Sequence, residues 1–171
     1  MGISNKDTND NPMVDRVAQM PDNDPDIVIF EGCRNDYNHN VPLGSDDPND
    51  FDTTTLKGAI RYMLRALRQK YPNATIICMN YWDTPSGANA TGVSCNGYAA
   101  TMLKLCRDLG YLTIDLMDTD LCGVNMQDTL FRELYSRAPN DVSHLTDRGM
   151  RYAYPYLEKA LADVLAKAWA K

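Results

Sequence analysis

Three short apolar segments, separated from one another by helical patterns, constrain the fold of this chain more than any other feature. They are residues 26–31 (DIVIFE), 74–79 (ATIICM) and 111–117 (YLTIDLM). The first two are rich in β-branched residues and almost continuously apolar, which is typical of strands buried on both faces of a parallel sheet. The sequence therefore predicts a central sheet of buried strands.

Apolar residues recur at helical spacing around these segments, over residues 13–20, 56–67, 98–109 and 150–165. Strands that alternate with helices predict right-handed crossovers and an α/β fold, with a parallel sheet packed by helices. In such a fold the loops that follow the strands gather at one edge, where ligands bind. The long loops here are residues 33–51, 81–96 and 118–143.

Length and composition are those of one globular domain spanning residues 1–171, with 44% hydrophobic residues. A net charge of −6 argues against a nucleic-acid partner, which requires a basic face. No segment is apolar enough to span a bilayer, so we expect no membrane partner. Five cysteines without a Cys-x-x-Cys pair are typical of buried, reduced thiols and of a cytoplasmic chain. A longer native form that is secreted remains an alternative.

The strongest local motif joins Asp141 to His144, just before the last helical pattern. A carboxylate three residues before a histidine can hold the Nδ1–H of the imidazole, which leaves Nε2 as a general base. The alternative is a surface loop in which Asp141 caps backbone N–H groups.

A second motif, Gly-Cys-Arg-Asn-Asp, directly follows the first predicted strand. Its Asn35 lies at the carboxyl edge of the sheet, where a side-chain N–H can stabilise a developing oxyanion. The alternative is a plain Asn-Asp turn, because both residues favour turns.

Together the two motifs resemble the SGNH hydrolase superfamily of GDSL-like lipases, acylhydrolases and esterases. Members carry a Gly-x-Asn-Asp block after the third strand and an Asp-x-x-His block before the last helix. The stretches NDYNHNVPLGS and DVSHLTDRGM are similar to family sequences. The resemblance implies a three-layer α/β/α, flavodoxin-like fold with strand order 2-1-3-4-5, in which the two N-terminal strands are missing here.

The resemblance also implies roles for individual residues. His144 is the expected base, Asp141 orients it, and the amide of Asn35 forms the oxyanion hole with the backbone N–H of Gly2. Gly2 enters because Gly-Ile-Ser at positions 2–4 resembles the family's second block. Two further polar residues are possible substrate contacts: Asp36 and His39. For His39, a plain surface position is the alternative.

Two departures from the family pattern concern the nucleophile. Cys33 stands where the family has glycine, and the sequence contains no Gly-Asp-Ser block. Ser94 and Cys33 are alternative nucleophiles, but Ser94 follows a loop rather than a strand, and Cys33 is expected to be a buried thiol. A metal site built from the two histidines and nearby aspartates is a further alternative, but its spacing matches no known site. We therefore expect neither metal nor cofactor.

These observations predict an ester hydrolase that uses a Ser-His-Asp mechanism on small-molecule or carbohydrate esters, acetyl esters among them. Because the nucleophile is absent, this chain alone is expected to be nearly inactive. The alternative is a non-catalytic carbohydrate-binding or interaction module that retains the cleft. The apolar strand from Asp26 to Glu31 is expected to lie at an edge of the sheet, which predicts self-association or pairing with a supplied N-terminal fragment.

Overall fold

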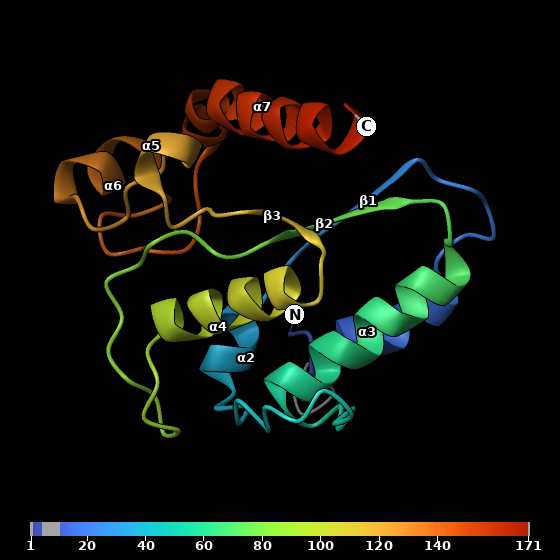
Figure 1. Cartoon of the computed structure of the whole chain (residues 1–171). Coiled ribbons are helices and arrows are strands. Elements are labelled where there is room, and N and C mark those ends of the chain that lie inside the picture. Colours follow the sequence, from blue (N-terminus) through green and yellow to red (C-terminus); the bar gives the residue numbers. More distant parts are fainter. Residues whose placement is uncertain (1, 5–10, 171) are drawn as a thin grey trace.

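The sheet lies between two layers of helices in the computed structural model, which describes residues 2–4 and 11–170 (Figure 1). Helix α7 covers one face, and α3 and α4 cover the other. In chain order the elements are α1 (Met13–Arg16), the 3-10 turn η1 (Val17–Gln19), β1 (Ile27–Glu31), α2 (Arg34–Asn38), α3 (Leu56–Lys70), β2 (Thr75–Met79), α4 (Cys95–Asp108), β3 (Leu112–Ile114), α5 (Thr119–Cys122), α6 (Thr129–Tyr135) and α7 (Asp147–Trp169).

All strand pairs are parallel, in the order β1-β2-β3. Ile27 of β1 pairs with Thr75 of β2, and Met79 of β2 pairs with Ile114 of β3. Three parallel strands with helices on both faces confirm the predicted three-layer α/β fold class. Among the described residues β1 has no strand on its outer side, so its outer hydrogen-bonding groups form a free sheet edge.

Strand β3 is shorter than predicted. Beyond Ile114, the buried side chain of Asn80 takes the place of the backbone hydrogen bonds that would continue the pairing of β2 with β3. Its Oδ1 accepts a hydrogen bond from the Leu116 N–H at 2.6 Å, and its Nδ2 donates to Asp115 at 2.7 Å. Residues beyond Ile114 therefore turn away from the sheet toward the loop that carries α5 and α6.

The helices over residues 56–67, 98–109 and 150–165 are confirmed, and each begins at a polar cap. Thr55, Ser94 and Thr146 each accept a hydrogen bond from the N–H of the glycine three residues later. Such caps satisfy backbone donors that the first turn leaves unpaired. The pattern over residues 13–20 forms α1 and the short turn η1 rather than one helix.

Helices α2, α5 and α6 lie in segments that the sequence predicts as loops. The signal that could have revealed α5 and α6 is an aspartate at each N-cap. Asp118 accepts hydrogen bonds from the N–H groups of Asp120 and Leu121, and Asp128 accepts one from Leu130. Helices of four to seven residues show too few turns for an apolar period to be visible.

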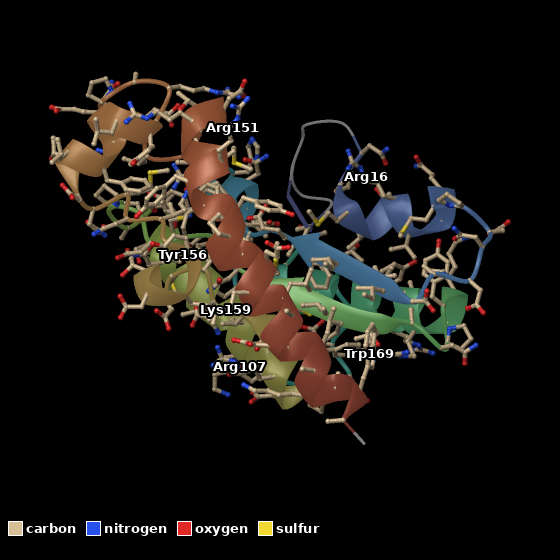
Figure 2. All side chains as sticks on the ribbon, turned by 90° about the horizontal axis from the view of Figure 1, so that it is seen from above. Arg16, Arg107, Arg151, Tyr156, Lys159 and Trp169 are labelled. Carbon is tan, nitrogen blue, oxygen red and sulfur yellow. The ribbon has the colours of Figure 1, made fainter. Side chains whose placement is uncertain are left out.

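Two hydrophobic clusters pack on the two faces of the sheet. Figure 2 shows α7 crossing the sheet and leaving β1 uncovered. As a result, Ile29 of β1 is 42% exposed although it lies in the middle of an apolar strand. No helix in the described part of the chain is long and apolar enough to cross a membrane.

Candidate active site

A polar hollow of about 380 Å³ lies at the carboxyl ends of β1 and β2, where a parallel sheet of this kind binds ligands. Asn35 and His144, far apart in the sequence, both line it. Residues from the end of β1, from α2 and from the loops after β1, after β2 and before α7 complete the lining: Glu31, Gly32, Arg34, Asn38, Tyr81, Trp82 and Ser143. The fold therefore brings the two motifs of the sequence to one place.

The carboxylate of Asp141 holds the imidazole of His144. The Nδ1 atom of His144 lies 3.2 Å from Oδ1 and 3.1 Å from Oδ2 of Asp141, and the histidine side chain is 58% exposed. A hydrogen bond at Nδ1 sets the tautomer in which Nε2 is the proton acceptor. The pair therefore has the geometry of a general base and its orienting acid.

Backbone donors fix Asp141 in turn. Its Oδ1 accepts hydrogen bonds from the N–H groups of Ser143 at 2.8 Å and His144 at 2.9 Å. Desolvation by burial opposes ionisation, but these two donors and the imidazole outweigh it and hold the pKa of Asp141 below its ordinary value. The aspartate therefore caps backbone, as the alternative interpretation had it, and also contacts the histidine.

The hydroxyl of Tyr81 ties this loop to the sheet. It donates a 2.6 Å hydrogen bond to the carbonyl oxygen of Ser143, the residue before the histidine. Burial is the main reason that the pKa of Tyr81 rises to about 12, so the phenol keeps its proton and remains a donor. Tyr81 thus helps to fix the position of His144 beside the hollow.

Asn35 lies in the first turn of α2, beside the end of β1. Its Oδ1 accepts a 3.4 Å hydrogen bond from the side chain of Asn38. With the amide oriented this way, the nitrogen carries the remaining donors of the side chain, as an oxyanion hole requires.

The turn before Asn35 is strained by a side chain where the family has glycine. Cys33 adopts a left-handed conformation, with φ at 78°, and is completely buried. Such a φ is disfavoured for residues with a Cβ atom. Burial also raises the pKa of the Cys33 thiol far above its ordinary value, so the thiolate that a cysteine nucleophile needs is disfavoured.

Asp36 does not face the hollow, which corrects the prediction of a substrate contact at this position. Its side chain is fully buried, and its two carboxylate oxygens accept the N–H groups of Ile3 and Ser4, each at 2.9 Å. A carboxylate with two backbone donors is a structural tie between the N-terminal segment and α2. This link depends on the buried backbone N–H groups of residues 3 and 4, and the Gly-Cys-Arg-Asn-Asp motif alone does not indicate that they lie beside Asp36.

This tie places Gly2 close to the second motif. A Cβ atom on Gly32 would lie 2.8 Å from the side chain of Ile3, so Ile3 packs directly against the turn after β1. Gly2 is buried but is not among the residues that line the hollow. His39 forms the C-cap of α2 and lies outside that lining too.

The alternative nucleophile and the metal site find no support in this geometry. Ser94 is the N-cap of α4, and its hydroxyl oxygen accepts the Gly97 N–H at 3.1 Å. All five cysteines are buried and none forms a disulfide. Within residues 2–4 and 11–170, no group of three or more His, Cys, Asp or Glu side chains could hold a metal ion.

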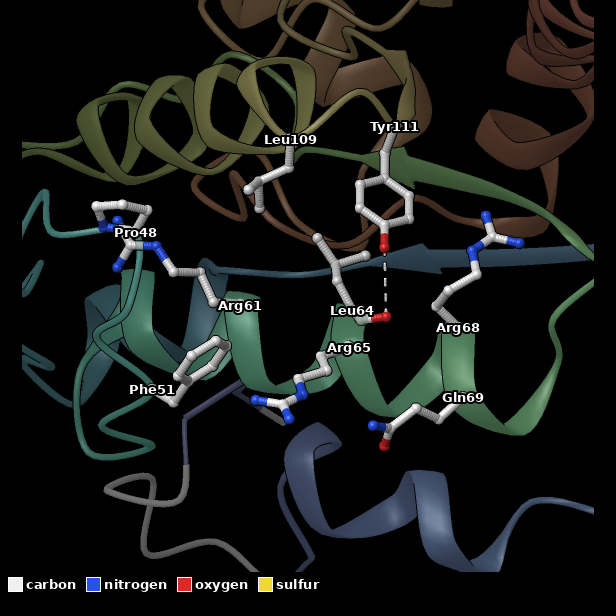
Figure 3. Close-up of a pocket in the computed structure, with 9 residues that line it drawn as sticks. All are labelled: Pro48, Phe51, Arg61, Leu64, Arg65, Arg68, Gln69, Leu109 and Tyr111. Carbon is white, nitrogen blue, oxygen red and sulfur yellow. Dashed lines mark hydrogen bonds between the residues drawn. The ribbon is translucent and has the colours of Figure 1, made fainter.

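A second hollow, of about 350 Å³, lies between α3 and the end of α4 and is lined by three arginines of α3 (Figure 3). Each of them already has a structural contact. Arg61 and Arg68 donate to backbone carbonyls of the loops beside α3, and Arg65 lies 5.3 Å over the ring of Phe51. Figure 3 shows the three guanidinium groups pointing in different directions. The polar hollow at the strand ends is therefore the better candidate for chemistry.

Comparisons with known proteins agree with the fold. The sequence pattern of the GDSL-like lipase/acylhydrolase family matches residues 1–152. No curated protein matches the chain. One solved structure, 24% identical, has a TM-score of 0.83 and covers 95% of this chain and 75% of its own. A protein of Lactobacillus plantarum, 22% identical, has a TM-score of 0.78 with 95% and 76% covered.

A third solved structure, from Bacteroides ovatus, is described as a GDSL-like lipase. It is 19% identical, has a TM-score of 0.64, and covers 95% of this chain and 67% of its own. At such identities the structures are evidence for a shared fold, whereas the family pattern concerns the sequence itself.

Proposed function

The chain belongs to the GDSL-like lipase/acylhydrolase family, and from this premise we propose that the polar hollow is the acid–base and oxyanion part of an ester hydrolase site. One observation carries the proposal: an imidazole oriented by a carboxylate lines the same hollow as the amide of Asn35. Base, orienting acid and oxyanion donor are three of the four parts that acyl transfer by a serine requires.

In the proposed reaction, Nε2 of His144 takes the proton of a serine hydroxyl as the serine oxygen attacks the ester carbonyl. Asp141 holds the imidazole in the required tautomer and stabilises the imidazolium that forms. The carbonyl oxygen gains negative charge and is stabilised by the amide N–H of Asn35. The family resemblance implies the backbone N–H of Gly2 as a second donor, although Gly2 is not among the residues that line the hollow. The imidazolium then protonates the departing alcohol, and water releases the acid by the reverse steps.

The serine is the part that this sequence does not supply in a Gly-Asp-Ser block. Ser143 also lines the hollow, directly before His144 in the chain, and its backbone N–H and carbonyl hold the loop of His144. We therefore propose that a separate segment carries the nucleophile. Without it, only the oxyanion and binding contributions remain, which are worth roughly 10³–10⁴ over water in triad enzymes.

The test uses p-nitrophenyl acetate and two forms of the protein. The 171-residue chain is expected to show at most this residual hydrolysis, unchanged by His144→Ala. The same chain joined to a strand–Gly-Asp-Ser–helix segment from another family member is expected to hydrolyse the ester, and to lose this activity in His144→Ala. Turnover by the unmodified chain that disappears in His144→Ala would instead place a nucleophile within it. Inactivity of the completed protein would favour a non-catalytic module.

A further inference from the structure

Two buried cysteines meet where α4 packs against β2. Cys78 lies in β2, and Cys106 lies in the last turn of α4. Both side chains are completely buried and belong to the same hydrophobic cluster. Their thiol groups are hydrogen-bonded to each other. The reaction proposed for the polar hollow uses neither of them, so the pair has no role in the chemistry described above.

The backbone, and not only the two side chains, brings these residues together. Cys78 pairs with Thr113 of β3. The carbonyl oxygen of Cys106 accepts a 3.0 Å hydrogen bond from the N–H of Tyr111, two residues before Thr113. The side chains of Ile76 and Cys78 share one face of the sheet, and Figure 1 shows α4 on this face. The short turn between α4 and β3 therefore fixes Cys106 beside the strand that contains Cys78.

We propose that Cys78 and Cys106 are a redox-sensitive pair, which forms a disulfide between β2 and α4 when the chain meets a low-molecular-weight disulfide such as oxidised glutathione. The thiolate of one cysteine attacks a sulfur of oxidised glutathione and releases one glutathione thiolate. The thiolate of the second cysteine then attacks the protein sulfur of this mixed disulfide and releases the other. The two cysteines lose two electrons and two protons, which end in two molecules of reduced glutathione.

The other three cysteines are less suited to this pairing. Cys122 lies in the second hydrophobic cluster, where its thiol donates to the carbonyl of Leu116 at 3.1 Å. Cys95 begins α4, at the opposite end of the helix from Cys106. Burial first, and then the nearby Cys95, raises the pKa of the Cys33 thiol, so these two form the competing pair. Cys33 lies in the strained turn before α2, and closing a disulfide there would have to respect its φ of 78°.

The disulfide is expected to form as the chain folds, or when the end of α4 opens, rather than in the closed structure. The hydrogen bond with Cys106, and then burial, raises the pKa of the Cys78 thiol, which keeps the closed pair unreactive. Once formed, the cross-link closes a loop over residues 79–105. This loop contains Tyr81, whose hydroxyl holds the carbonyl of Ser143. The cross-link restricts the unfolded chain and should therefore stabilise the segment that supports the hollow.

The experiment refolds the reduced, urea-unfolded chain in a buffer rich in oxidised glutathione and then blocks the remaining thiols. Digestion with chymotrypsin and trypsin, which cut after Tyr81 and Lys104, separates Cys78, Cys95 and Cys106 into different peptides. Mass spectrometry is expected to find the link between Cys78 and Cys106 as the main product. An even mixture of pairings, a main link between any other two cysteines, or no disulfide at all would overturn the inference.

Urea denaturation of the oxidised and reduced forms tests whether the fold accommodates the link. The oxidised natural chain should unfold at a higher urea concentration than the reduced one, and so should Cys122→Ala, the matched control. Cys106→Ala should give the same midpoint in both buffers. A link that does not raise the midpoint would show that it forms only by distorting the fold, and would refute the inference. Neither measurement involves ester hydrolysis, so the result is independent of the proposed function.

Discussion

The phenol of Tyr81, two residues beyond β2, donates a 2.6 Å hydrogen bond to the carbonyl of Ser143, and this contact fastens the histidine loop to the end of the sheet. Tyr81→Phe removes only the donor. We expect a loss of about 1 kcal/mol in the free energy of unfolding, because the carbonyl loses its buried partner. Urea denaturation measures the loss. Tyr62→Phe, at an exposed tyrosine of α3, is the control and should leave stability unchanged.

Asp141→Asn tests the carboxylate that holds His144. Hydrogen bonds lower the pKa of Asp141 in the folded protein, so its contribution to stability is complete above the unfolded value of about 3.9 and is lost as pH falls through the folded value. The variant should therefore be less stable by about 1–2 kcal/mol at pH 7. As the pH falls through the folded pKa of Asp141, the stabilities of the two proteins should converge. Urea melts across this range check it, and a difference independent of pH would contradict the assignment.

Glu31→Gln should change the free energy of unfolding in the opposite direction and stabilise the folded protein. Burial raises the folded pKa of Glu31 to about 7, so the folded protein retains a proton there that the unfolded chain has lost. Stability then falls as pH rises from about 4.5 to 7, and the charged form is destabilising above that range. We expect the variant to be about 1–3 kcal/mol more stable than the natural chain at pH 8 and nearly equal to it at pH 4. Thermal or urea melts at the two pH values decide this.

Substitutions of Cys33 test whether the backbone of the second motif is strained. Its φ of 78° is tolerated by a small side chain and disfavours a β-branched one. Cys33→Val should destabilise the fold by about 2 kcal/mol or more, and by clearly more than Cys33→Ala, since both remove the thiol but only valine adds a branch. Equal losses in denaturation experiments would show that packing, rather than backbone strain, dominates at this position.

The free edge of β1 should mediate self-association. Ile29 is 42% exposed at this edge, and apolar hollows of about 340 Å³ and 450 Å³ flank it on the two faces of the sheet. We expect size-exclusion chromatography with light scattering to show a dimer or larger species, and Ile29→Lys to yield a monomer because a charge blocks edge pairing. Leu130→Lys, at an exposed position of α6, is the matched control. A natural chain that is already monomeric would refute this prediction.

The sequence by itself determined the architecture, because each element depends mostly on local properties. Buried strands need continuous apolar runs, and amphipathic helices need apolar residues that recur about every 3.6 positions. Helix caps need polar residues such as Thr55 and Thr146. The Asp141–His144 contact was likewise predictable, since its partners are only three positions apart in the sequence. The short helices α5 and α6 were missed because their apolar period is too brief to recognise.

Only the tertiary structure decided what each polar residue near the second motif does. Asp36 and Asn35 are neighbours in sequence, yet Asp36 is buried against Ile3 and Ser4 while Asn35 lines the hollow. The grouping of Glu31, Arg34 and Trp82 likewise depends on β1 lying beside β2. Which polar side chain meets backbone and which faces a ligand is set by packing between distant segments, and one sequence does not encode that packing in any local pattern.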